Sequence, residues 1–163
     1  WLMGINFFGV VHACGAFLPH LRRVPAAAIG VLLSDFALVG FPTKSAYCAS
    51  KFAVRGFAES LRAELHGSTV ALTCVYPGPV DTALVRGSRG SVDPAKRDAE
   101  AAFVAARGNP PATVAARILD GLERRRARVL IGKETWAIDL AKRIAPAFTD
   151  AIVARVQRRL PFV

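Results

Sequence analysis

The chain has 163 residues, of which 53% are apolar, and a formal net charge of +10. This length is enough for one domain with one core, and the apolar share excludes a generally disordered protein. The three cysteines are odd in number and lie in apolar segments, which favours buried thiols in a reducing compartment over a disulfide framework. The three histidines are scattered and no Cys-x-x-Cys occurs, so we assign no metal site.

The hydrophobic pattern predicts helices that alternate with strands. In chain order we expect helix 2–22, strand 29–33, helix 45–65, strand 70–76, a turn-rich stretch to 111, helix 113–125 and strand 128–131. Such alternation predicts parallel βαβ units and therefore an α/β fold. The weakly charged stretch 24–42 is long enough to suggest a membrane span, but its prolines and glycines favour a short buried strand.

Tyr47 and Lys51 stand four residues apart at the head of the second expected helix. Side chains at this spacing share one helical face, so we expect the ammonium beside the phenol. There it would lower the phenol's pKa and suit it to general acid–base catalysis. By itself, such a pair is more often a solvated surface pair.

Further polar signals occur in a fixed order around this pair. Asn6 lies in the first helix, Ser34 follows strand 29–33, and Pro77-Gly78-Pro79-Val80-Asp81-Thr82 follows strand 70–76. With Ser34 thirteen residues before Tyr47, the chain resembles the short-chain dehydrogenase/reductase family over residues 1 to about 132. The resemblance implies the C-terminal part of a Rossmann-like doubly wound parallel sheet. It also implies a small alcohol or carbonyl substrate and NAD or NADP as cofactor.

The resemblance assigns a role to each catalytic position. Tyr47 would exchange a proton with the substrate oxygen, and Ser34 would hold that oxygen. Lys51 would lower the pKa of Tyr47 and bind the nicotinamide ribose, while Asn6 would hold a water that completes a proton relay. Local alternatives remain, because Ser34 also suits an ordinary turn and a helical Asn often bonds its own backbone.

The turn after strand 70–76 would position the nicotinamide carboxamide in the same family. The residues that would do so are Pro77, Gly78, Val80 and Thr82, alongside Tyr47 and Lys51. An ordinary Pro-Gly turn is the alternative.

Two segments depart from the family pattern or vary within it. Leu33 stands where the family commonly has a second Ser, and Asp35-Phe36-Ala37 replaces small residues, so the shape of the substrate pocket is open. Phe36 or Phe41 would either wall that pocket or join the core.

Residues 84–109 correspond to the substrate-covering region of the family, where long irregular loops often serve as lids. This segment contains Arg86, Gly87, Arg89, Gly90 and the pair Asp93-Pro94.

The strand and Gly-rich phosphate turn with which the family begins do not occur in this chain. We therefore interpret it as the C-terminal part of a longer enzyme, in which the choice between NAD and NADP is made elsewhere. The alternative is a non-catalytic binding or assembly module that retains the fold.

The excess positive charge lies in the C-terminal half, with 16 basic and 8 acidic groups in residues 86–163. The densest cluster is Arg124, Arg125, Arg126 and Arg128, which favours a solvated helix end over a nucleic-acid site. We divide the chain into a dehydrogenase-like part, 1–132, and a basic amphipathic tail, 133–163.

The tail repeats an apolar residue at every fourth position. The members of this stripe are Trp136, Leu140, Ile144, Phe148, Ile152, Val156 and Leu160. We expect the stripe to pack on the domain or on a partner subunit, with attachment to a membrane surface as the lesser alternative and a kink at Pro146. The cysteines and the resemblance together predict a cytoplasmic homodimer or homotetramer.

Overall fold

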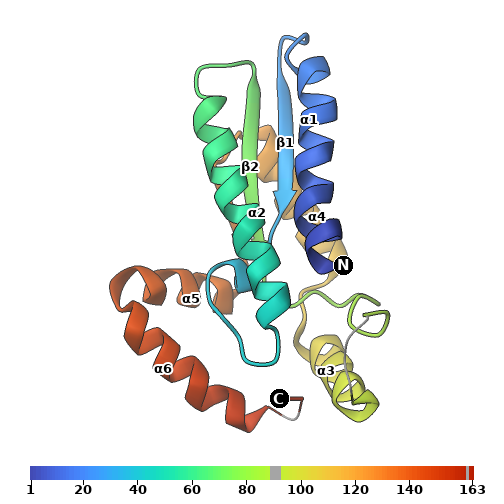
Figure 1. Ribbon diagram of the computed structural model, residues 1–163, viewed down its shortest axis with the longest axis vertical. Coiled ribbons are helices and arrows are strands. Elements are labelled where there is room, and N and C mark those ends of the chain that lie inside the picture. Colours follow the sequence, from blue (N-terminus) through green and yellow to red (C-terminus); the bar gives the residue numbers. More distant parts are fainter. Residues whose placement is uncertain (89–92, 161) are drawn as a thin grey trace.

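In the computed structural model, which describes residues 1–88, 93–160 and 162–163, three parallel strands form one sheet (Figure 1). They are β1 (Ala27–Leu32), β2 (Val70–Pro77) and β3 (Arg128–Ile131), side by side in chain order. Ala27 lies opposite Val70, and Cys74 lies opposite Arg128. The predicted α/β fold with a parallel sheet is confirmed, and the predicted strands match to within two residues at either end.

Helices cover both faces of this sheet. The helices α1 (Gly9–Leu21) and α2 (Ser45–Glu64) lie on one face, and α4 (Pro111–Glu123) lies on the other (Figure 1). The central strand β2 is buried over most of its length, as expected for a parallel strand covered on both sides. The three cysteines are all free and buried, as predicted, and burial raises the pKa of each thiol.

The first helix is not uniform. Residues Gly4–Phe8 form a π-helical segment, η1, before α1 begins, and Asn6 lies within it. A single π turn inside a helix widens the backbone spacing and is frequent at functional sites.

Residues Gly4–Leu21 are also long and apolar enough to cross a membrane, with a mean hydropathy of 1.2 and 6% of the stretch buried. Helices that pack on other protein meet the same criterion. Cys14 belongs to the core, and Val10 and Leu18 pack against it.

The turn-rich stretch expected before residue 111 contains a helix, which corrects that prediction. Helix α3 spans Pro94–Arg107, and the Asp93 side chain accepts a hydrogen bond from the Ala95 amide at its start. Asp93 and Pro94 are a helix cap and first-turn proline rather than a loop signal. Arg89 and Gly90, also named in that expectation, lie outside the described residues.

The tail consists of two helices that meet at Pro146. Helix α5 spans Lys133–Ile144, α6 spans Pro146–Val156, and a short turn η3 (Gln157–Arg159) follows. The expected kink at Pro146 is therefore a complete break. Of the alternatives for the stripe, packing on the domain is not found, because six of its seven members are between 40% and 74% exposed, and packing on a partner subunit or a membrane surface stays a prediction. These six are Trp136, Leu140, Ile144, Phe148, Ile152 and Val156.

Candidate functional site

The predicted catalytic residues converge at the C-terminal edge of the sheet, where open α/β sheets bind ligands. Ser34 follows β1 and begins the short helical turn η2 (Asp35–Ala37). Tyr47 lies in the first turn of α2, near enough to Ser34 for the Ser34 side chain to lower the pKa of the phenol. The spacing of Ser34 and Tyr47 thus brings the two residues to the same part of the site.

Lys51 lies one helical turn after Tyr47 and points to the same edge. Its Nζ donates a 3.0 Å hydrogen bond to the carbonyl oxygen of Leu32 and lies 5.7 Å from the centroid of the Tyr47 ring. An ammonium has three N–H groups, so this bond leaves two for other acceptors. Burial lowers the pKa of Lys51.

The pKa of Tyr47 moves opposite to our expectation. Burial is the main cause of its increase, and the nearby carboxyl of Asp35 adds to it, while the hydrogen bond with Ser34 lowers it. Burial disfavours the charged phenolate, and the Lys51 ammonium, which was expected to favour it, binds the Leu32 carbonyl instead.

Asn6 reaches the same helix through Ser50. The Asn6 amide donates to the Ser50 hydroxyl at 3.0 Å, and that hydroxyl donates to the Tyr47 carbonyl oxygen at 2.7 Å. Ser50 is completely buried. Sequence reasoning gave Ser50 no role, although its place next to Lys51 was a signal. The relay water on Asn6 stays a prediction.

The turn after β2 is held by the end of α3. The Pro79 carbonyl accepts hydrogen bonds from both the backbone and the side chain of Asn109, and the Asp81 amide donates to the Asn109 carbonyl. A methyl group at Gly78 would meet the carboxylate end of the exposed Glu134 side chain, which would have to move, and would lie 3.0 Å from Thr135 Oγ1.

Val80 and Thr82, the other two residues of the turn that were predicted to bind the cofactor, are less buried than Gly78. Val80 is half-buried and pairs with Asn109 in an isolated bridge. Thr82 is exposed, and its Oγ accepts a hydrogen bond from the Leu84 amide at 3.4 Å.

Two phenylalanines lie beside Tyr47. Phe36 contacts the Tyr47 ring edge-on at 6.1 Å between centroids and stacks on Phe41 at 5.0 Å. Both phenylalanines are only half-buried, so the stack forms an apolar wall next to the phenol.

Asp35, which the sequence analysis noted only as a departure, belongs to this cluster. Ser34 Oγ donates to Asp35 Oδ1 at 2.8 Å, and both residues are 8% exposed. Burial raises the pKa of Asp35 to about 6; the hydrogen bonds from Ser34 and the Phe36 amide oppose this increase, and the charge of Glu134 adds to it. The site therefore holds a carboxyl group that titrates near neutral pH.

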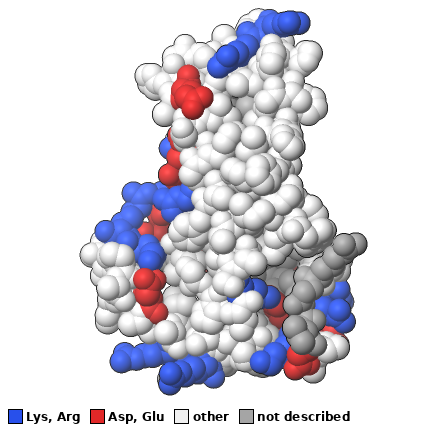
Figure 2. All heavy atoms as spheres, in the orientation of Figure 1, with Lys and Arg blue, Asp and Glu red and all other residues white. Residues whose placement is uncertain are grey.

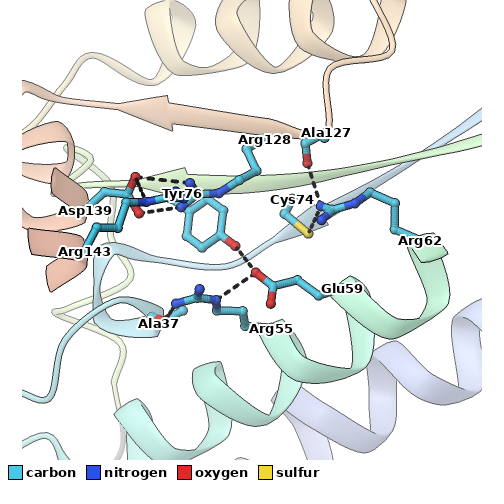
Figure 3. Close-up of polar contacts among 10 residues, drawn as sticks. All are labelled: Ala37, Arg55, Glu59, Arg62, Cys74, Tyr76, Ala127, Arg128, Asp139 and Arg143. Atoms are coloured by element: carbon cyan, nitrogen blue, oxygen red, sulfur yellow. Dashed lines mark hydrogen bonds and ion pairs between the residues drawn. The ribbon is translucent and has the colours of Figure 1, made fainter.

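A polar network lies behind the site and supports η2 (Figure 3). Arg55 on α2 donates to the Ala37 carbonyl at 3.1 Å and pairs with Glu59, which accepts a long hydrogen bond from the Tyr76 hydroxyl. Arg128 lies over the Tyr76 ring at 4.9 Å. Four elements, α2, η2, β2 and β3, are thereby joined.

The α5 end of this network is an ion-pair cluster. Asp139 accepts hydrogen bonds from both terminal nitrogens of Arg128, at 2.6 and 3.1 Å, and one from Arg143 (Figure 3). The hydrogen bonds from Arg128 are the main cause that lowers the pKa of Asp139.

A pocket of about 420 Å³ lies between α2 and α5 but contains none of the predicted site residues. Its three cations, Arg55, Lys142 and Arg143, each pair with a carboxylate of this chain. We therefore assign the chemistry to the Tyr47 cluster.

The side chains of the arginine cluster near residue 125 also have partners within the chain. Arg124 and Arg126 pair with Asp120, Arg125 donates to backbone carbonyls, and Arg128 pairs with Asp139.

Two contacts of helix α3 were not predicted from the sequence. Glu100 on α3 forms an ion pair with Lys44 at 2.6 Å, and both side chains are largely buried. Lys44 lies three residues before Tyr47 in the chain. Phe103 packs edge-on against Phe162 near the end of the chain, at 5.3 Å between centroids.

Comparison with known proteins gives matches along most of the chain. A family model described as short chain dehydrogenase matches residues 1–92. SadH of Mycobacterium tuberculosis, which is named as an oxidoreductase, is 36% identical over 157 residues, covering 94% of this chain and 56% of that protein. The 3-ketodihydrosphingosine reductase of Bacteroides thetaiotaomicron is 40% identical over 80 residues, or 49% of this chain and 30% of that protein.

Solved structures show the same fold. A short chain dehydrogenase from Burkholderia cenocepacia, in complex with NADP, has a TM-score of 0.76 and 27% identity, covering 93% of this chain and 56% of that one. A Burkholderia phymatum relative, in complex with NAD, has a TM-score of 0.75 and 24% identity, with coverages of 88% and 56%. The chain thus spans about half the length of the relatives that it matches along most of its own length.

Proposed function

The chain belongs to the short-chain dehydrogenase family, and we propose that the polypeptide containing it is an oxidoreductase that interconverts a hydroxyl and a carbonyl group with NAD or NADP. The observation that carries this proposal is the meeting of Ser34, Tyr47 and Lys51 at the C-terminal edge of the sheet. The activity, the substrate and the partners of the whole polypeptide are all part of the proposal.

Tyr47 is the proton donor and acceptor. In carbonyl reduction its hydroxyl gives a proton to the substrate oxygen, and in alcohol oxidation its phenolate removes one. The raised pKa keeps Tyr47 protonated at neutral pH, which favours its use as an acid. Ser34 donates a hydrogen bond to the same oxygen. When bound, the nicotinamide cofactor supplies or accepts the hydride.

The residues near the site fit a nicotinamide nucleotide. Lys51 keeps two N–H groups for the ribose hydroxyls, and the Thr82 hydroxyl, which accepts from Leu84, keeps its own proton for a carboxamide. Pro77, Gly78 and Val80 complete the loop around that position. The NADP complex of the Burkholderia cenocepacia relative supports this assignment. NAD and NADP both stay open, because the ribose 2′ position is read near the Gly-rich turn of such folds.

The substrate is proposed to be a small organic alcohol or carbonyl compound. The stack of Phe36 and Phe41 beside Tyr47 favours an apolar group next to the reacting carbon. The keto compound in the name of the Bacteroides thetaiotaomicron relative is consistent with a carbonyl substrate.

The assembly is proposed to be a cytoplasmic homodimer or homotetramer formed through α1 and α2. Figure 2 shows that the face over these helices carries few charged side chains, which gather instead at the left and along the bottom of the view, where Figure 1 draws α5, α6 and α3. The exposed large apolar side chains on these helices and on the segment before them are Trp1, Met3, Ile5, Phe8, Phe17 and Phe52. An uncharged apolar face of this kind is typical of a subunit interface.

Replacement of Tyr47 by Phe tests the function. In the native polypeptide that contains this chain, turnover of a ketone panel with NADPH or NADH should fall at least about hundredfold in Tyr47→Phe, while cofactor affinity is kept. Tyr76→Phe is the matched control, since it removes the chain's other phenol from the buried network. Full turnover in Tyr47→Phe would contradict the proposal. Inactivity of the wild type with intact cofactor binding would favour an assembly module.

A further inference from the structure

Ser34 has one proton and more than one oxygen that could accept it. Its Oγ accepts a hydrogen bond from the Phe36 amide at 3.2 Å and donates to Asp35 Oδ1 at 2.8 Å. The Tyr47 hydroxyl is near enough for Ser34 to lower its pKa. A hydroxyl carries a single O–H, so a proton directed to Asp35 is withheld from Tyr47 and from a substrate oxygen.

Asp35 is built into the site. Its carboxyl is buried, and the oxygen that accepts from Ser34 also accepts from the Phe36 amide at 2.9 Å. Two cations of α2 hold the backbone on either side of it, since Lys51 binds the Leu32 carbonyl and Arg55 binds the Ala37 carbonyl. The carboxyl is thus fixed in place next to Ser34.

The titratable groups around Asp35 come from three elements. From α2, Tyr47 and Cys48 interact with its charge, and from α5, Glu134 does so. The strand β2, which also packs against η2, carries Cys74 and Tyr76 but no Asp, Glu, Lys, Arg or His. Asp35 titrates at about 6 in this setting, so both of its forms occur near neutral pH.

We propose that Asp35 is a positioning residue that controls where the Ser34 proton points. The ionised carboxylate accepts that proton, whereas the protonated carboxyl donates to Ser34 Oγ and frees the Ser34 O–H for the substrate oxygen beside Tyr47. This inference rests on the proposed function of the site. It extends that function by adding a carboxyl group that acts through Ser34 without touching the substrate.

The proposal predicts how the rate of carbonyl reduction depends on pH. As pH falls through about 6, Asp35 takes up a proton, and the rate constant for carbonyl reduction should rise about tenfold, the effect of one added hydrogen bond to the reacting oxygen. In Asp35→Ala and Asp35→Asn this rise should be absent. Asp120→Asn, which changes a carboxylate on α4 away from the site, should keep it.

A double-mutant cycle in the native polypeptide separates control through Ser34 from a simple charge effect. The readout is the absorbance of the Tyr47 phenolate without substrate, taken as the difference from the same protein carrying Tyr47→Phe. Asp35→Ala should shift the phenolate midpoint downward, and this shift should shrink by more than half when Ser34 is also replaced by Ala. An equal shift with and without Ser34 would overturn the proposal.

This readout does not depend on turnover. If Tyr47→Phe leaves the enzyme fully active, the proposed function fails while the cycle still measures the coupling of Asp35 to Ser34. Asp35→Asn, which keeps the shape of the side chain, replaces Asp35→Ala in the cycle if the alanine variant does not fold.

Discussion

Lys51 Nζ donates a 3.0 Å hydrogen bond to the Leu32 carbonyl oxygen, which joins the helix that carries Tyr47 to the end of β1. Leu32 is 55% exposed, so this joint lies at the rim of the site rather than in the core. The ammonium is therefore held in place by the backbone while part of its donor capacity faces outward.

Lys51→Met should weaken cofactor binding at least about tenfold and lower turnover about hundredfold, because both the ribose donor and the bond that joins the Tyr47 helix to the end of β1 are lost. Cofactor titration by fluorescence and steady-state kinetics measure the two effects. Lys96→Met on α3, an exposed position, is the control. Unchanged cofactor affinity in Lys51→Met would remove Lys51 from the binding site.

Asp139→Asn should lower the free energy of unfolding by about 2 to 3 kcal/mol, because it leaves Arg128 and Arg143 without their shared carboxylate. Urea unfolding measures this change. The control is Asp150→Asn, whose carboxylate is 59% exposed and pairs with Lys142, so its loss should cost at most about 1 kcal/mol.

The same pair predicts a pH dependence. Arg128 lowers the pKa of Asp139 below its unfolded value, so the stabilisation is complete above the unfolded pKa and is lost as pH falls through the folded pKa. The cost of Asp139→Asn should therefore shrink toward acid. A cost that stays constant between neutral pH and the acid limb would show that the charge of Asp139 is not its source.

Glu100→Gln should loosen α3 from the start of α2, because it removes the ion pair with Lys44. We expect hydrogen exchange of α3 amides to become about fivefold faster, the effect of about 1 kcal/mol in local stability. Glu123→Gln, at the exposed end of α4, should leave α3 unchanged. Unaltered exchange in Glu100→Gln would mean that other contacts, such as that of Phe103 with Phe162, hold α3.

The sheet could be predicted because its strands are short apolar runs between helix patterns, and strand 128–131 was placed to the residue. Helix α3 could not be placed, because its exposed, Ala-rich sequence lacks a buried stripe and only Asp93-Pro94 marks its start. Within the site, the spacing of Ser34, Tyr47 and Lys51 was sufficient to predict their convergence.

The electrostatics of the site could not be predicted from spacing. Whether the pKa of Tyr47 rises or falls depends on burial and on where Lys51 points, and both depend on the packed structure. The partners Arg128 and Asp139 are 11 residues apart and Lys44 and Glu100 are 56 apart, so no helical or strand period relates them.

The order of the strands in space, β1-β2-β3, is also the order in which a ribosome would make them. Each new strand therefore finds its neighbour already synthesised, and each crossover helix can cover the sheet before the next strand emerges. We expect this part of the chain to assemble progressively during translation, with β2 docking on β1 once β2 itself has left the exit tunnel.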